Sequence, residues 1–548
     1  MFALATLVFA ACSDDHAISD GNSDVVTDPS GDAWVALNIK TPAAVTRGLN
    51  TPNQENAITG EYEIEDVKAI FFDGDQDASL VTKVIDLSTG SGDLTSSGAS
   101  SSSKAFQIPA TSKTILIIAN PGAGFSSVGE GSSFVDVNKA VKDESITTSV
   151  AKTGTFLMTN SKGHLEPSDN SGNTINLTLY KSQDVAVKNP LAIYIDRVVA
   201  KVRVYTSDGA MDNSTASIYS PKWILNVTNK WYYPVSRRIK TWNEDPANTP
   251  DARGTCVTPF DRYEIGSYRV DPNYNNTNIG EWNEANQVAY TNNYNFVSAS
   301  TNASAISWNE ISSASNPVTE YCLENTQEKE YNNHAYTTQV LLQANFAPKK
   351  LKKLDGGTVD VGEGESWMIV NGVSYTYDTL MDWIENELTK KYKDGNPDGY
   401  PTSISTAFNR YVKYVDSSKE VTIPTGDEFK QSGQSAETQA AALKQKFVDA
   451  RLAVENKGAG SYGTVFYYDG GVSYYKIMIK HDDSDKAMNE FGVVRNSVYD
   501  INIKGFNNPG YPTIPDPDPD TPDENDETWL SIQINVNPWT WYSQEEIL

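Results

Sequence analysis

The chain has 548 residues, with 44 Lys and Arg against 71 Asp and Glu, and a formal net charge of −27. Such a charge argues against nucleic-acid binding as a main function, and the length predicts more than one domain. Ser, Thr, Asn and Gly are plentiful, there are 29 Tyr, and apolar residues alternate in short bursts between Gly, Pro and Asn breaks. These features are typical of an all-β chain.

The first stretch, residues 2–11, is short and mostly apolar, and it ends in small residues before Cys12. The pattern resembles a bacterial lipoprotein signal with Cys12 as the lipidated residue, although no Lys or Arg precedes the apolar run. The alternative is an uncleaved apolar N-terminus with an incidental cysteine. The run is too short to span a bilayer, and no later run approaches the ~20 apolar residues that a membrane helix needs.

The first predicted strand covers residues 34–40. After Trp34, the aliphatic residues Val35, Leu37 and Ile39 fall on every second position. That period is typical of a strand with one buried face.

A polar, turn-rich stretch follows this strand. Arg47 is the only basic residue between Lys40 and Lys68, so a protease that recognises arginine meets a single target, the Arg47–Gly48 bond. Proteolytic nicking concentrates in exposed loop tips of this kind. The alternative is an ordinary loop arginine.

Residues 48–205 are expected to form an N-terminal β domain, with Ser/Gly-rich loops such as residues 89–104. The predicted strands are Tyr62–Phe72, Ala105–Ile108, Thr114–Ala119, Gly154–Met158, Ile175–Tyr180 and Leu191–Tyr205. Residues 73–78 have the first acidic spacings of a calcium loop, but Ala78 replaces the required Gly and Val84 stands where a bidentate Glu is needed. An acidic turn is therefore the better interpretation.

The second half, residues 206–508, has predicted strands around Trp223–Val227 and Trp231–Val235. The Asn/Tyr-rich stretch 273–296 either stacks sugars or a partner's side chains, or forms exposed loops. Helical spacing of apolar residues predicts helices at Thr376–Lys390 and Glu437–Val454. Neither helix has metal-ligand or catalytic spacing, and we expect no cofactor.

With Cys12 assigned to the lipid, two cysteines remain, Cys256 and Cys322. In an oxidising compartment they form either a disulfide or two separate buried thiols, and the sequence does not decide between them. The four His lie in unlike contexts, so none is an evident partner for a Cys nucleophile. No acid/base pair or metal cluster stands out either, and we expect no enzyme.

Near the C-terminus, residues 512–527 contain five prolines, seven acidic residues and no basic residue. This composition predicts an extended, self-repelling spacer, which at ~3.1 Å per residue spans on the order of 50 Å. A last strand is predicted within residues 528–548. Its aliphatic anchors are Leu530, Ile532, Ile534 and Val536, and its aromatic residues include Trp529, Trp539 and Trp541.

The two terminal strands share one pattern, because WVALNI at 34–39 and WLSIQI at 529–534 match in kind at every position. Two such strands can compete for one groove, which is the physics of donor-strand complementation. While the first strand is covalently attached, its high effective concentration holds the other out. A cut after Arg47 removes that tether and separates Cys12 from the rest of the chain.

Motifs spread over nearly the whole chain carry a family resemblance. They are FLMTNS (156–161), IDRVVAKV (195–202), YCLENT (321–326), TTQVLLQANFAPK (337–349) and VVRNSVYDINIKGF (493–506), followed by a Pro/Asp linker and a terminal WxxxxxxVxPW strand. In this order they resemble the Bacteroidales fimbrillins of the type V pili, and more narrowly the major shaft subunits of the short, Mfa-type fimbriae.

The resemblance implies two transthyretin-like β-sandwich domains, lipidation at Cys12 and maturation by an Arg-specific surface protease between Arg47 and Gly48. It also implies that strand 34–40 is discarded and that the stretch from Trp529 through Trp539 enters a neighbouring subunit. The expected segments are 1–12 (lipoprotein signal), 13–47 (propeptide), 48–205 and 206–508 (the two domains), 509–527 (linker) and 528–548 (donor strand).

Two functional classes remain open from the sequence. A shaft pilin, which supports adhesion and biofilm formation, would have as partners copies of itself, anchor and tip subunits, the outer membrane before maturation, and host or bacterial surface receptors. The alternative is a surface-anchored glycan-binding lipoprotein or a fimbrial tip or accessory adhesin. The glycan-binding hypothesis predicts a monomer that stays lipidated, with residues 528–548 folded back on their own domain. The presence of both Arg47 and a C-terminal strand favours the shaft role.

Overall fold

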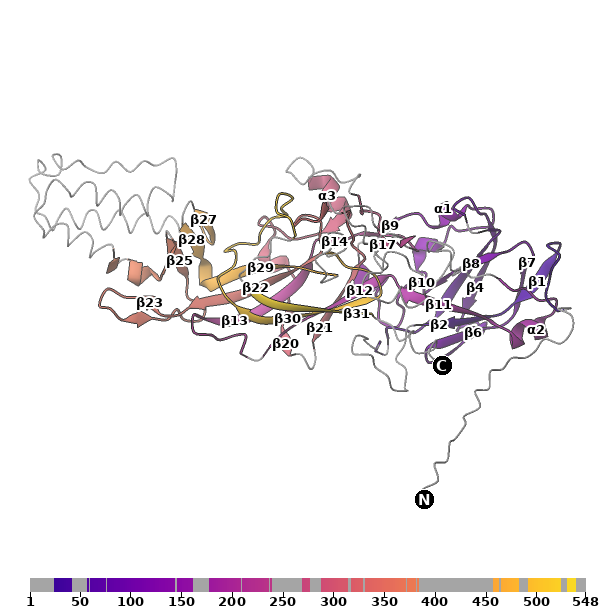
Figure 1. Cartoon of the computed structure of the whole chain (residues 1–548), viewed down its shortest axis with the longest axis horizontal. Coiled ribbons are helices and arrows are strands. Elements are labelled where there is room, and N and C mark those ends of the chain that lie inside the picture. The colour runs from indigo at the N-terminus through magenta and orange to yellow at the C-terminus, as the bar shows by residue number, and fades with distance from the viewer. Residues whose placement is uncertain are drawn as a thin grey trace, which may run out of the picture.

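The computed structural model describes residues 24–41, 57–58, 60–74, 76–142, 145–160, 177–207, 209–235, 237–238, 269–275, 287–313, 317–328, 331–370, 372–380, 382–383, 457–462, 465–481, 491–523 and 530–538. Strands dominate these residues and the helices are short, which confirms the predicted all-β fold. Figure 1 shows the indigo and purple first half and the magenta-to-yellow second half following one another along the long axis.

The first half is built on an eight-stranded sheet in the order β4-β3-β8-β10-β11-β2-β6-β5, with β1 paired to β7 beside it. These strands are β1 (Asp32–Val35), β2 (Leu37–Lys40), β3 (Asp66–Phe72), β4 (Val81–Ser88), β5 (Leu94–Ser97), β6 (Ser100–Ser103), β7 (Phe106–Pro109), β8 (Thr114–Ala119), β10 (Met158–Asn160) and β11 (Leu191–Arg197). Phe71 of β3 and Leu37 of β2 lie in one buried cluster. The two ends of the sheet therefore enclose a common core.

The Ser/Gly-rich stretch 89–104, predicted as a loop, contains a hairpin. Strands β5 and β6 pair antiparallel on either side of Gly98, whose φ is 58°. Strand β6 then pairs with β2 on its other side. The loop prediction is wrong because a serine-rich strand carries no apolar alternation, yet pairing with β5 on one side and β2 on the other satisfies the backbone groups of β6.

The second half contains a sandwich of two sheets, one in the order β20-β12-β30-β31 with β21 also paired to β12, the other in the order β19-β13-β22-β29. Their strands are β12 (Val199–Thr206), β13 (Ala216–Asn226), β19 (Asn309–Glu310), β20 (Ser312–Ser313), β21 (Val318–Leu323), β22 (Gln339–Pro348), β29 (Val472–Met478), β30 (Ser497–Phe506) and β31 (Leu530–Pro538). Val202 and Ile501 from one sheet share a buried cluster with Trp223 and Leu342 from the other.

Smaller elements extend both halves. One four-stranded sheet consists of β25 (Trp367–Val370), β26 (Val373–Tyr375), β27 (Gly460–Tyr462) and β28 (Val465–Tyr468). Two-residue strands are β9 (Val141–Lys142), β14 (Thr228–Asn229), β15 (Trp231–Tyr232), β16 (Arg237–Arg238), β17 (Arg269–Val270), β18 (Tyr294–Asn295), β23 (Leu351–Lys352) and β24 (Thr358–Val359). The helices are α1 (Phe134–Val137), α2 (Gln183–Lys188), α3 (Gln287–Asn293), η1 (Ala123–Phe125), η2 (Ile146–Thr148), η5 (Ala303–Ala305) and η7 (Asp469–Gly471).

Of the two helices predicted for the second half, only the start of Thr376–Lys390 is described, where residues 377–380 are helical. The other, Glu437–Val454, lies outside the described residues. No helix in the described part of the chain is long and apolar enough to cross a membrane. Within that same part, no three His, Cys, Asp or Glu side chains gather as a metal site would require.

Residues 191–205, predicted as one strand, are two strands in different sheets. Strand β11 pairs with β10 and β2 in the first half, whereas β12 pairs with β30 and β21 in the second half. The change of sheet falls at Val198, one strand earlier than the expected boundary at 205. The alternation continues through both strands, so the pattern alone does not mark the change.

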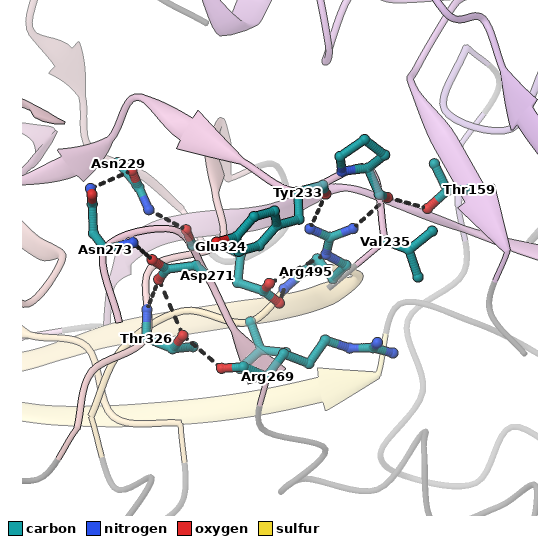
Figure 2. A network of polar contacts seen from close by, with 12 residues as sticks. Thr159, Asn229, Tyr233, Val235, Arg269, Asp271, Asn273, Glu324, Thr326 and Arg495 are labelled. Carbon is teal, nitrogen blue, oxygen red and sulfur yellow. Dashed lines mark hydrogen bonds and ion pairs between the residues drawn. The ribbon is translucent and has the colours of Figure 1, made fainter. Parts of the chain in front are cut away.

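Buried polar contacts fasten the two halves around Arg495 (Figure 2). Its guanidinium donates to the carbonyl oxygens of Tyr233 and Pro234 at 2.9 and 3.1 Å, and its Nε lies 3.4 Å from Glu324 Oε1. The Pro234 carbonyl also accepts a hydrogen bond from Thr159 Oγ1 of the first half at 2.7 Å. The Pro234 carbonyl therefore accepts hydrogen bonds from both halves at their buried junction.

The Pro/Asp-rich linker is not a free spacer over its described part. Ile514 is 5% exposed and Asp523 is fully buried, and Tyr511 exchanges backbone hydrogen bonds with Tyr474 at 2.8 Å each. The predicted extended spacer is therefore wrong for residues 512–523. Backbone pairing and an apolar anchor hold an acidic segment whose composition alone indicates a solvated chain.

Candidate functional site

The first predicted strand lies inside the core of the first half. It forms β1 and β2, and Val35, Leu37 and Ile39 are at most 1% exposed. All three belong to the cluster that fills this half. Fully burying an aliphatic side chain contributes roughly 1.5–3 kcal/mol, so this segment is part of what holds the fold together.

Backbone pairing holds the segment on several sides. Strand β2 runs parallel to β11 and antiparallel to β6, and β1 pairs antiparallel with β7. Trp34 also exchanges backbone hydrogen bonds with Tyr180, at 2.7 and 2.9 Å. Removing residues 32–40 would leave the facing edges of β6, β7 and β11 unpaired, and unpaired edges accept another strand readily.

The opposite face of the segment is packed as well. Ala36 is 2% exposed and clusters with Ala105 and with Ala186 of α2, beside Trp34 and Tyr180. Because Ala186 is itself fully buried, a large side chain at position 36 would have to displace α2. A strand that takes this place therefore needs a small residue there.

Serines of β6 also hold β2, and no motif in the sequence marks them as site residues. Ser103 Oγ accepts from the Leu37 amide at 2.9 Å, and Ser100 Oγ donates to Asn38 Oδ1 at 2.5 Å. The only signal was the Ser run itself, which composition does not distinguish from a flexible linker.

A buried charge cluster fixes the chain after the candidate cleavage site. Glu61 Oε1 lies 2.9 Å from Lys201 Nζ and accepts from Tyr321 OH at 2.7 Å, and the Glu61 carbonyl accepts from Arg197 Nε at 2.7 Å. Burial alone would raise the pKa of Glu61, but the Lys201 ammonium and the Tyr321 hydroxyl bring that pKa below its ordinary value. The chain around Glu61 is thus held by contacts that do not involve the segment before Arg47.

The predicted donor strand is β31, at an edge of the second half. It pairs antiparallel with β30 of its own subunit, and β30 is its only neighbour among the described strands. Its aliphatic positions pair with buried residues of β30: Ile532 with Ile503, Ile534 with Ile501 and Val536 with Tyr499. One strand therefore holds β31, whereas two hold β2.

Several predicted site residues lie outside the described residues, namely Cys12, Arg47, Gly48, Cys256, Trp529, Trp539 and Trp541. Cys322 is described, and it is a free thiol with no exposed surface in the core of the second half. Burial raises the pKa of the Cys322 thiol far above its ordinary value. The structure therefore holds no disulfide at Cys322.

The fold and its two terminal strands define an all-β protein with one strand buried in a core and one at a sheet edge. Residues 466–545, which include β29, β30 and β31, match the family described as major fimbrial subunit protein type IV, fimbrillin, C-terminal. The resemblance to fimbrillins expected from the motifs is thereby confirmed for this part of the chain. No curated protein matches the chain.

Solved structures that resemble the chain share little sequence with it. A putative cell adhesion protein from Parabacteroides distasonis is 12% identical, with 92% of this chain and 97% of that chain covered and a TM-score of 0.38. The fimbrilin FimA from Porphyromonas gingivalis is 12% identical, with 92% and 98% covered and a TM-score of 0.33. The tip fimbrial protein Mfa3 from Porphyromonas gingivalis is 10% identical, with 93% and 100% covered and a TM-score of 0.32.

Proposed function

We propose that the chain is a shaft subunit of a cell-surface fimbria. It is exported as a lipoprotein on Cys12, is cut after Arg47, and polymerises when the C-terminal strand of one copy replaces β1 and β2 of the next. The fimbrillin match over residues 466–545 supports the fimbrial role. Such a head-to-tail contact does not close on itself, which is the geometry that gives fibres.

One observation carries the proposal: a strand that fills the core of the first half precedes the only arginine between Lys40 and Lys68. A single cut there turns a covalent core strand into a separate peptide. The vacated groove would expose apolar surface and unpaired backbone, so another strand of the same pattern is favoured to enter it.

The C-terminal strand has the pattern that the groove requires. When Trp529 is aligned with Trp34, the aliphatic residues coincide, with Leu530 at position 35, Ile532 at 37 and Ile534 at 39. Ser531 then falls at Ala36, where only a small side chain fits, and Val536 falls at Thr41, which is 3% exposed. One additional buried aliphatic residue is worth ~1.5–3 kcal/mol, which makes the exchange favourable.

The cut at Arg47 also sets the timing. While the first strand is tethered, its effective concentration at the groove is on the order of millimolar or more, so a strand from another copy competes poorly. After the cut, the Glu61 cluster keeps the new N-terminal region in place while the propeptide and its lipid leave. The partners are an Arg-specific surface protease, copies of this chain, anchor and tip subunits, and receptors on host or bacterial surfaces.

The test is limited digestion of the purified chain with an arginine-specific protease, followed by electrophoresis without boiling. We expect a ladder of oligomers from the wild type. The Arg47→Ala variant and a chain that ends at Asp523 should each stay monomeric after the same treatment. Equal ladders from either variant would contradict strand exchange at these sites.

The pairing of β31 with its own β30 favours a second candidate, a surface-anchored glycan-binding lipoprotein or accessory adhesin. Such a protein stays monomeric and keeps the lipid on Cys12. Mass spectrometry of the chain recovered from cell envelopes separates the two: a lipidated N-terminus and the absence of any ladder support the adhesin, and an N-terminus at Gly48 supports the pilin.

A further inference from the structure

The docked linker, residues 511–523, which we call the strap, is anchored firmly at its first end. Tyr511 is paired with Tyr474 through two backbone hydrogen bonds, and Tyr468 OH donates to the Gly510 carbonyl at 2.9 Å. Ile514 enters a buried cluster with Leu341. These contacts combine backbone pairing, a side-chain hydrogen bond and apolar burial, so the first end is a packed part of the second half.

The other end of the strap is anchored too. His334 N donates to the Thr521 carbonyl at 3.1 Å, and Asp523 N donates to the Asn332 carbonyl at 3.2 Å. The buried carboxylate of Asp523 accepts a hydrogen bond from the Thr337 hydroxyl. Two further contacts hold the strap. The Ala299 amide donates to Asp516 Oδ1 at 3.0 Å between the ends, and Lys476 Nζ lies 5.2 Å from the centre of the Tyr511 ring at the first end.

The strap reverses the direction of the chain. Strand β30 leads away from the junction of the two halves, where Asn496 N bonds to the Val199 carbonyl. The strap ends beside Asn332, close to Tyr336. The Tyr336 carbonyl accepts a hydrogen bond from Asn325, and Asn325 pairs with Val493 near that junction. The docked strap therefore brings the C-terminal end of the chain back over its own subunit.

This reversal limits where the C-terminal strand can go. Six residues separate Asp523 from Leu530, which allows about 25 Å at full extension. With the strap undocked after Phe506, 23 residues precede Leu530, and an extended chain of that length spans about 70 Å. The docked strap thus favours the pairing of β31 with its own β30.

We propose that the strap is a second lock, which holds the C-terminal strand on its own subunit and must open for polymerisation independently of the cut at Arg47. The inference rests on the proposed function and adds that the donating end of the subunit is controlled as well as the accepting end. The cut frees the groove, and release of the strap frees the strand that fills it.

A disulfide across the strap tests this lock. Asn333 and Pro522 face each other as an antiparallel pair, and the hydrogen bonds on either side of them make it a non-hydrogen-bonded pair. Such pairs have Cα atoms ~4.5 Å apart, within the range that a disulfide spans. The variant is Asn333→Cys with Pro522→Cys, in full-length protein that also carries Cys12→Ser and Cys256→Ser.

After cleavage at Arg47, we expect the oxidised double variant to form no ladder and the reduced one to form ladders at the rate of each single variant. Ladders from the oxidised variant at the wild-type rate would overturn the lock alone, because the strand would then leave from a docked strap. A wild-type chain that stays monomeric after the cut would overturn the proposed function together with the lock.

A second variant covers the case in which the disulfide does not form. Ile514→Asp places a charge in the apolar cluster under the strap, whereas Thr513→Asp adds the same charge at a partly exposed position next to it. We expect Ile514→Asp to speed ladder formation of the cleaved chain at least fivefold and Thr513→Asp to change it less than twofold. Equal rates for both variants would overturn the lock.

Discussion

Two strands of nearly the same pattern occupy opposite situations in this molecule. Strand β2 is paired on both sides and its aliphatic side chains are at most 1% exposed, whereas β31 is paired on one side at the edge of a sheet. The pattern shared by the two strands predicts that both can fill one groove. Under the proposed function, β2 leaves only after the chain is cut, whereas β31 leaves when its edge pairing and the strap are released.

The largest expected effect comes from the small position in the groove. In the proposed alignment Ser531 takes the place of Ala36, which packs against Ala186 of α2. We expect Ser531→Phe to abolish ladders of the cleaved chain, because the phenyl ring cannot fit beside α2. Electrophoresis without boiling measures this directly.

The matched control is Asn535→Phe. Asn535 aligns with Lys40, which is partly exposed in β2, so the same added volume meets solvent there. We expect ladders from this variant at near the wild-type yield. Loss of ladders from both variants would point to damage of the edge strand itself and would contradict the alignment.

A smaller effect is expected at the anchor that stays behind. Glu61→Gln leaves the Lys201 ammonium buried without its carboxylate, and breaking a buried ion pair in this way costs roughly 3–5 kcal/mol of the free energy of unfolding. Asp86→Asn is the control, since the Asp86 side chain is 73% exposed in its pair with Lys68 and such pairs contribute about 0–1 kcal/mol. Urea unfolding of both variants measures the difference, and equal losses would contradict a special role for Glu61.

The core strand itself can be weakened without a cut. Leu37→Ala removes a fully buried side chain and should cost roughly 2–5 kcal/mol of the free energy of unfolding. After cleavage at Arg47, the weakened peptide should also leave faster, so ladders appear sooner. Asp32→Ala, at an exposed position of β1 in the same segment, is the control; the same acceleration there would mean that burial does not hold the strand.

The strands predicted correctly from the sequence are those with a strong apolar pattern. The predicted strand Thr114–Ala119 is β8 with the same bounds. A short, continuous apolar run between turns is typical of a fully buried strand. The strand from Trp34 was likewise predicted as one with a buried face. The structure adds that this strand lies between two others, which depends on partners about 60 and 150 residues away in sequence, Ser100 and Leu191.

The sequence did not predict segments whose composition indicates a flexible chain but whose backbone is paired in the fold. The serines of β6 and the prolines of the strap each indicate a flexible segment, and in both cases a neighbouring strand supplies the backbone bonds. The junction around Asp271 and Arg495 is a further example (Figure 2). Burial raises the pKa of Asp271 to about 7 although Thr326 and Asn273 donate to it, and nothing in the local sequence marks that carboxylate as buried.

The smallest expected effect is a dependence of the strap on pH, through His334. Its backbone amide holds Thr521 of the strap, and its Nδ1 lies 2.9 Å from Lys476 Nζ. Burial first, and then the Lys476 ammonium, lower the pKa of His334 to about 4, while Asp518 acts in the opposite direction. The unfolded chain, with an ordinary histidine pKa of ~6.5, takes up the proton first.

The contribution of His334 to the free energy of unfolding should therefore stay level above about pH 6.5 and fall as the pH drops from there towards 4, by about 2 kcal/mol at pH 5. His334→Gln, which keeps an acceptor for Lys476, should remove that part of the slope. His481 is buried too and its pKa is lowered to about 3, so His481→Gln flattens the slope by a similar amount. His481 bonds to Tyr499 inside the sandwich, whereas the His334 amide bonds to the strap. Hydrogen exchange at residues 511–523 therefore distinguishes the effect of His334 from that of His481. Because amide exchange is itself slower in acid, the quantity to compare is the protection factor at each pH. It should fall with acid in the wild type and in His481→Gln but not in His334→Gln, and an equal fall in all three would show that His334 does not couple pH to the strap.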